Sequence, residues 1–194
     1  MPTQTSSPRP DAPLRYGPAA QLLHWATALL VLVAFLYGPG GSEARVYMPS
    51  RDFDRHLHET LGTAVLVLAV VRVAWRMVAR RPDPAPVSRW MGLTAAAVQG
   101  LLYLLLFAVP LTAILGAWLE GHPLAYLGGF EIGAPLAAAH QLGVTVATIH
   151  TWLGDAILWV AGLHALAALY HHVVLRDGVL ASMLPGWLPV PPRR

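Results

Sequence analysis

The sequence predicts an all-α integral membrane protein, a bundle of four transmembrane helices. Hydrophobic residues make up 56% of the 194 residues and charged residues only 12%, which is about half the charged share of a soluble domain. The apolar residues are gathered into four long runs, separated by segments rich in Gly, Pro and charged residues. A helix of about 20 apolar residues crosses a bilayer, and each of the four runs is long enough to do so.

The ends of the four spans follow from helix-breaking residues and from the limits of the apolar runs. Pro18 suits the first turn of a helix, and the first run ends at Gly38. Three prolines in the segment RRPDPAPVSR end the second run, because proline removes a backbone hydrogen bond from a helix interior. The expected spans are therefore residues 17–38, 58–80, 91–119 and 145–175.

The remaining segments are expected to be tails and loops around this domain, which occupies residues 17–177. Residues 1–16 are rich in Pro and Ser, a composition typical of a disordered tail, and residues 178–194 form a short second tail. The Gly- and Pro-rich connection between the third and fourth spans has room for a short surface helix.

Arginine positions predict the orientation of the bundle. All 13 residues counted as Lys or Arg are arginines, and most lie beside the two termini and the middle loop. The positive-inside rule therefore places both termini and that loop in the cytoplasm. This topology, together with anionic lipid, explains the net charge of +3 better than nucleic-acid binding does. The absence of cysteine excludes disulfides and cysteine-ligated clusters but leaves histidine ligation open.

Four histidines form two levels in the predicted bundle. His150 and His164 lie fourteen residues apart, which places them on one helix face with a rise of roughly 21 Å between them. His58, near the outer end of the second span, matches the depth of His150, and His24 in the first span matches His164. Two bis-histidine metal centres stacked through a helix bundle require this arrangement.

Haem suits these pairs better than zinc does. Haem accepts two imidazoles in an apolar pocket, whereas zinc takes three or four ligands. Gly62 and Gly154 each follow a histidine by four residues, so they leave space for a flat ring on the same helix face. The alternative is that the histidines only pack within the membrane.

Four sequence motifs resemble one known family. They are LLHW in the first span, HxxxG opening the second, VVRVAWR closing it, and LHALAALYHHVVLRDGVLASMLP at the end of the fourth. This pattern resembles the bacterial dihaem cytochrome b(561) family, whose four-helix members include the superoxide oxidases of the inner membrane. The resemblance implies a multi-pass protein of the bacterial inner membrane with two haem b groups, whose axial ligands are His24, His58, His150 and His164.

The resemblance also implies ubiquinone near the cytoplasmic end of the bundle. His171 lies seven residues beyond His164, where it could hydrogen-bond a quinone carbonyl and donate a proton. Arg72 projects towards the inner haem level, fourteen residues after His58, and could contact a haem propionate or the quinone.

Two functions remain open at this point. The first is an oxidoreductase that takes electrons from superoxide in the periplasm and passes them through both haems to ubiquinone. The second is a non-catalytic electron-transfer subunit, or membrane anchor, for a periplasmic redox protein. Arg45, Arg51 and Arg55 lie in the first outer loop, where a positive patch would attract superoxide. Nearby carboxylates partly cancel the patch, so an ordinary solvated loop is an equal alternative. The expected partners are therefore the lipid bilayer, a quinone, and either superoxide or a periplasmic protein, with no nucleic acid.

Overall fold

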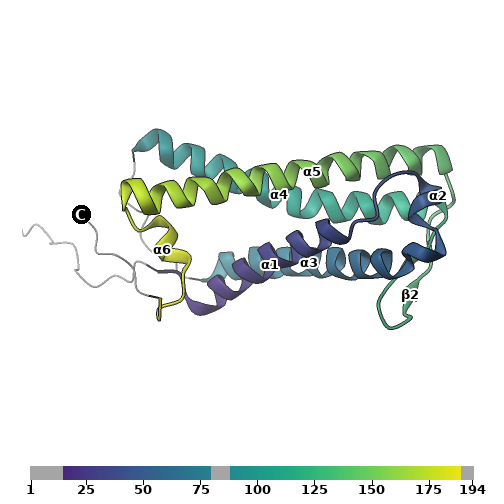
Figure 1. The fold of residues 1–194 in the computed structure, drawn as a ribbon, viewed down its shortest axis with the longest axis horizontal. Helices are drawn as coiled ribbons and strands as arrows, with labels where there is room; N and C mark the ends of the chain where they lie inside the picture. Colours follow the sequence, from purple (N-terminus) through teal and green to yellow (C-terminus); the bar gives the residue numbers. More distant parts are fainter. Residues whose placement is uncertain (1–14, 80–87, 189–194) are drawn as a thin grey trace, which may run out of the picture.

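Four long helices run side by side along the length of the molecule (Figure 1). The computed structural model describes residues 15–79 and 88–188. Each long helix is apolar enough to cross a membrane, so the predicted four-helix membrane bundle is confirmed. The helices are α1 (Pro18–Tyr37), α3 (Asp52–Val78), α4 (Arg89–Glu120) and α5 (His140–Tyr170).

Two helices begin earlier than their apolar runs. α3 starts at Asp52 instead of residue 58, and α5 starts at His140 instead of residue 145. The early turns of α3 are polar, and they are stabilised by ion pairs between residues three or four positions apart, which are neighbours on a helix surface. Hydropathy detects only the part of a helix that lies in lipid, so these polar turns were missed. The expected disordered tail and the proline-rich loop lie mostly outside the described residues.

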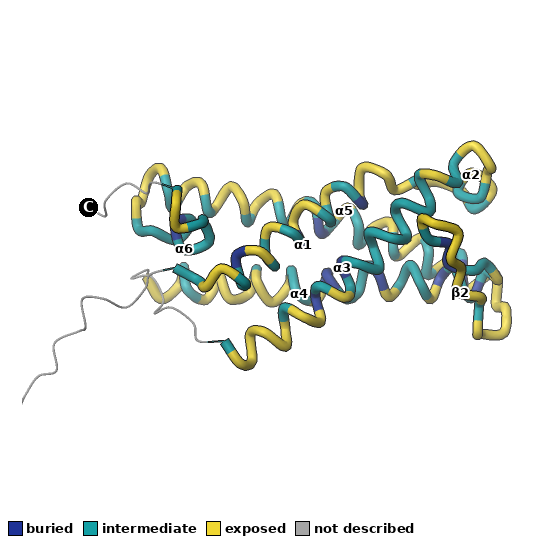
Figure 2. Tube along the Cα trace, turned by 90° about the horizontal axis from the view of Figure 1, so that it is seen from below, coloured by how far each residue is buried: buried dark blue, intermediate teal, exposed yellow. Residues whose placement is uncertain are grey.

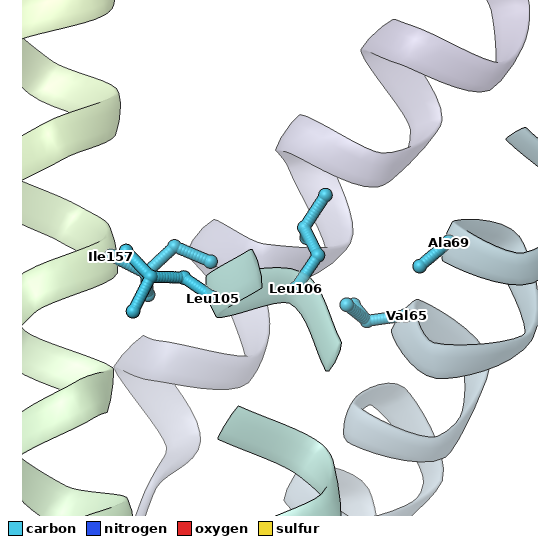
Figure 3. Close-up of a cluster of buried hydrophobic side chains, with 5 residues drawn as sticks. All are labelled: Val65, Ala69, Leu105, Leu106 and Ile157. Carbon is cyan, nitrogen blue, oxygen red and sulfur yellow. The ribbon is translucent and has the colours of Figure 1, made fainter. Parts of the chain in front are cut away.

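The helices pack in a chain of neighbours, with α1 on α3, α3 on α4, and α4 on α5. A cluster of buried side chains in the middle of the bundle joins the last three of these helices (Figure 3). Its members are Val65 and Ala69 of α3, Leu105 and Leu106 of α4, and Ile157 of α5. Figure 2 shows that buried stretches are few and that much of each helix is exposed on its outer side. The exposed side chains include Trp152 and Trp159.

Small residues bring α4 and α5 into close contact. A Cβ atom added to Gly116 would lie 3.1 Å from the backbone nitrogen of Ala147. Small residues at helix interfaces permit such close approach inside membranes.

Short elements cover the end of the bundle opposite the described termini, which we call the loop end. They are α2 (Glu43–Val46), the 3₁₀ turn η1 (Pro49–Arg51), and the antiparallel strands β1 (Leu124–Ala125) and β2 (Glu131–Ile132). The expected surface helix in the connection between α4 and α5 is therefore wrong: a hairpin forms there instead. Gly128 and Gly129 have positive φ angles in its turn, which glycine adopts readily. The hairpin is fixed to α3, because the backbone N–H of Ala125 donates to Glu59 over 2.5 Å.

The described part of the segment after α5, which the sequence analysis expects to be a short tail at residues 178–194, is folded. A π-helical turn, η2 (His171–Leu175), leads to a short helix, α6 (Val179–Met183). α6 and residues 184–188 pack against the beginning of α1 (Figure 1). Four donors near the beginning of α1 reach carbonyls of this segment over 2.9 Å: Tyr16 N to Ser182, Gln21 Nε2 to Leu184, Trp25 Nε1 to Met183, and Arg15 Nη1 to Pro185. Both ends of the described chain thus lie at one end of the bundle, and the membrane face to which that end belongs stays a prediction.

Candidate metal centres

His58 of α3 and His150 of α5 face each other towards the loop end. Their ring centroids are 5.9 Å apart, with an angle of 80° between the ring planes. A bond between a metal ion and an imidazole nitrogen is about 2 Å long, so two imidazoles on opposite sides of one ion have centroids about 6 Å apart. The separation of this pair therefore fits a single metal ion held between the rings.

The hydrogen bonds of His58 and His150 engage Nδ1 of each ring and leave Nε2 free to bind a metal ion. Nδ1 of His58 donates to the carbonyl of Ala34 over 2.7 Å, and Nδ1 of His150 donates to the carbonyl of Val109 over 2.9 Å. Metal-bound histidines usually donate their other ring N–H to such a carbonyl, which fixes the tautomer. The lone pairs of both Nε2 atoms thus remain available for an iron ion.

There is room beside this pair for a flat cofactor. A Cβ atom added to Gly62 or to Gly154 would have no neighbour within 4 Å, in agreement with the space expected from sequence. Further along α5, a hollow of about 380 Å³ is lined by Phe35 of α1 and by residues of α5 that include Trp159 and Gly162. The open space therefore lies along the stretch of α5 between His150 and His164.

His24 of α1 and His164 of α5 form a second pair nearer the termini. Their ring centroids are 6.4 Å apart, with an interplanar angle of 71°, so this separation also fits one metal ion. The four predicted ligands are thus brought together in the two pairs expected, and their role as haem ligands stays a prediction.

Arg72 lies beside the second pair. Its Nη2 donates to Nδ1 of His24 over 3.3 Å, and its guanidinium lies 5.5 Å from the ring centroid of Tyr103. Binding of a metal through Nε2 of His24 requires the proton to be on Nδ1, so Arg72 would have to turn away from that nitrogen. The guanidinium would then be free to pair with an anionic group such as a propionate.

His171 is held by the carboxylate of Asp177, which was not expected from the sequence. Its Nδ1 makes a close hydrogen bond to Asp177, and the other oxygen of Asp177 accepts the N–H of Val179 over 3.1 Å. The π-helical turn and the start of α6 bring these two residues together. A carboxylate six residues after the histidine was the only signal in the sequence, and a regular helix would not have placed the two side chains face to face.

Two of the three arginines expected to form a positive patch at the loop end, Arg51 and Arg55, pair with carboxylates. Arg51 pairs with Asp54 over 3.1 Å, and Arg55 pairs with Asp52 over 3.0 Å and with Glu59 over 3.4 Å. These ion pairs favour the ordinary loop over the anion-attracting patch.

Tyr47 lies next to this ion-pair network. The guanidinium carbon of Arg55 is 5.2 Å from the centroid of its ring. Burial, together with the carboxylates of Glu59 and Glu120, raises the pKa of the Tyr47 phenol, so the phenol stays neutral.

Comparisons with known proteins find one family that is similar to this chain over almost its whole length. Residues 15–186 match the family described as prokaryotic cytochrome b561. The chain is 31% identical over 175 residues to Cytochrome b561 homolog 2 of Escherichia coli, which covers 90% of this chain and 93% of that protein. It is 32% identical to the Probable superoxide oxidase CybB of Yersinia pestis, over 84% of this chain and 92% of that protein. It is 34% identical to Cytochrome b562 of Cereibacter sphaeroides, over 84% of this chain and 90% of that protein.

Proposed function

The chain belongs to the prokaryotic cytochrome b561 family and is a haem-binding electron-transfer protein of the bacterial inner membrane, and we propose that it oxidises superoxide and reduces ubiquinone. Electrons would enter at the loop end, which we assign to the periplasm, and leave near the termini. The positive-inside distribution of arginines supports this orientation.

The observation that carries the proposal is the presence of two histidine pairs at different depths. α5 contributes one histidine to each pair, and the two residues are fourteen positions apart, which corresponds to a rise of roughly 21 Å. His58 and His150 would hold one haem, and His24 and His164 the other. A haem with two imidazole ligands supplies one-electron transfer without an open coordination position for substrate.

The overall reaction balances with two superoxide ions for each quinone. Each superoxide gives up one electron and becomes dioxygen, and ubiquinone takes up two electrons and two protons to become ubiquinol. The resemblance to a relative named as a probable superoxide oxidase supports this choice of donor.

His171 would supply a proton at the quinone end. Because Nδ1 is engaged by Asp177, Nε2 is the nitrogen that can exchange a proton with a quinone carbonyl. Arg72 would pair with a propionate of the nearer haem or with the quinone.

The proposal is tested by supplying purified protein with superoxide and a ubiquinone analogue and recording ubiquinol formation. We expect one ubiquinol for every two superoxide ions and no product when superoxide dismutase is added first. A folded, haem-loaded protein that forms no ubiquinol would contradict the proposal. If a co-purified periplasmic redox protein then reduced the haems, the alternative of an electron-transfer subunit or anchor would hold.

A further inference from the structure

A second group of metal-ligating side chains lies at the loop end, outside the two histidine pairs. It consists of Glu43 in α2, Glu120 at the end of α4, His122 just after it, and His140 at the start of α5. One ligand atom from each of Glu43, Glu120 and His122 lies within 4.8 Å of the others. We propose that these four residues bind a divalent transition-metal ion of the zinc type.

The distances within the group are close to those of a metal site. Nε2 of His122 is 2.7 Å from one carboxylate oxygen of Glu43, and Nε2 of His140 is 3.4 Å from the other. Ligand atoms around a tetrahedral zinc ion are about 3.4 Å apart, given bonds of about 2 Å. The ligand atoms of Glu43, Glu120 and His122 lie within 4.8 Å of one another, so side-chain movements of roughly 1 Å bring them to tetrahedral separations.

The donor atoms select the kind of ion. Imidazole nitrogen and carboxylate oxygen together suit zinc and similar transition metals. Calcium and magnesium prefer sites made of oxygen alone. Two carboxylates and two neutral imidazoles also balance the charge of a divalent ion.

The two carboxylates of the group lie close together, with histidines as the salt-bridge partners of Glu43. Glu43 and Glu120 are close enough for their carboxylates to repel each other. Within the described ranges, the salt bridges of Glu43 are made with His122 and His140 and not with an arginine. A bound cation would take the place of the proton shared between His122 and Glu43 and would neutralise both carboxylates.

The backbone around the group is fixed before any ion binds. A Cβ atom added to Gly143 would lie 2.7 Å from the backbone nitrogen of Glu120, so only glycine lets α5 pass this close to the end of α4. The N–H of Ala139 donates to the carbonyl of Leu119, and the N–H of His122 donates to that of Ala117, each over 2.9 Å. The ring of Tyr47 stacks on His122 with 3.6 Å between centroids. These contacts hold the ligands in position and lower the cost of binding.

The site remains accessible and joins separate parts of the bundle. The side chains of Glu43, His122 and His140 are 31%, 30% and 59% exposed, so an ion can enter from solvent. Glu43 lies between α1 and α3, whereas the other ligands belong to the ends of α4 and α5. A bound ion would therefore cross-link the two halves of the bundle at the loop end.

The test is a zinc titration of the haem-loaded protein, purified without a histidine tag and treated with EDTA. We expect one zinc ion per chain and a higher melting temperature with zinc. Glu43→Gln and His122→Ala should each weaken zinc binding at least about tenfold and leave the haem spectrum unchanged. Glu131→Gln, which removes an exposed carboxylate of β2 at the same end, should bind zinc as tightly as the unmodified protein.

Three results would overturn the proposal. They are the absence of stoichiometric zinc binding, equal affinity in both ligand variants and the parent protein, and calcium binding as tight as zinc binding. Should one variant lose its haem spectrum, His140→Ala replaces it, because this exposed side chain can be removed with little effect on folding. Its weaker zinc binding would support the site, and unchanged binding would overturn the proposal of a four-residue site.

Discussion

Replacing His150 by alanine should remove one haem and leave the other in place. The ring of His150 faces His58, with a centroid separation of 5.9 Å, and the other pair lies fourteen residues further along α5. That distance is roughly 21 Å along the helix axis, so His24 and His164 keep their own separation. The variant also loses the hydrogen bond to Val109, which is worth about 1 kcal/mol. This loss is small against the free energy of unfolding of a typical protein, about 5–15 kcal/mol, so the variant should still fold.

The expected magnitude is a fall from two haems per chain to one. The measurement is the ratio of pyridine haemochrome to protein, together with a redox titration in which one of two transitions disappears. His56→Ala is the matched control. This histidine contacts Arg55 and pairs with no other histidine in the described part of the chain, so the variant should retain both haems.

Comparing His150→Ala with a variant of the second pair tests whether the ligands are paired as described. His24→Ala should remove the transition that survives in His150→Ala. If both variants lost the same transition, the ligands would be paired across levels. Loss of both haems from a folded His150→Ala protein would show that the two centres are not independent.

Three further predictions concern the surroundings of these centres. His171→Gln should retain both haems and slow ubiquinol formation by about 100-fold, the low end of the contribution of a general acid. An unchanged rate would contradict the assignment of His171 to the quinone site. Arg72→Met should lower the reduction potential of the nearer haem by about 60 mV, equivalent to ~1.4 kcal/mol, because a positive charge that stabilises the added electron is lost. An equal shift in Arg72→Lys would show that the charge is not the cause. Gly143→Ala should destabilise the protein by about 1–3 kcal/mol through overpacking, because the added Cβ atom would lie 2.7 Å from Glu120. The measurement is a lower melting temperature. Gly133→Ala, whose Cβ atom would have no neighbour within 4 Å, should leave the melting temperature unchanged.

The main features of the bundle could be predicted because a few simple rules govern them. Long apolar runs require membrane-spanning helices, and the spacing of His150 and His164 fixes two depths on one helix. The partners of these residues, His24 and His58, then follow from depth alone. Periodicity and hydropathy were sufficient for these features because lipid and helix geometry leave few alternatives.

The parts that were missed depend on contacts between distant residues. The hairpin at β1 and β2 is held by Glu59 and Thr60 of α3, which no local pattern reveals. The pairing of His171 with Asp177 depends on a π-helical turn that hydropathy does not report. The loop-end group of Glu43, Glu120, His122 and His140 assembles from three separate segments, so its members appear unrelated in the sequence.

The contact between α6 and the beginning of α1 affects how the protein is made. Gln21 and Trp25 are among the first described residues that a ribosome would synthesise, yet their partners Leu184 and Met183 follow 163 and 158 residues later. At 5–20 residues per second, roughly 8–30 s pass before these bonds can form. During that interval the first helix already lies in the membrane with its amide and indole donors open to other acceptors. A chain that stops before α6 would keep them open, so this contact forms only after α6 has been synthesised.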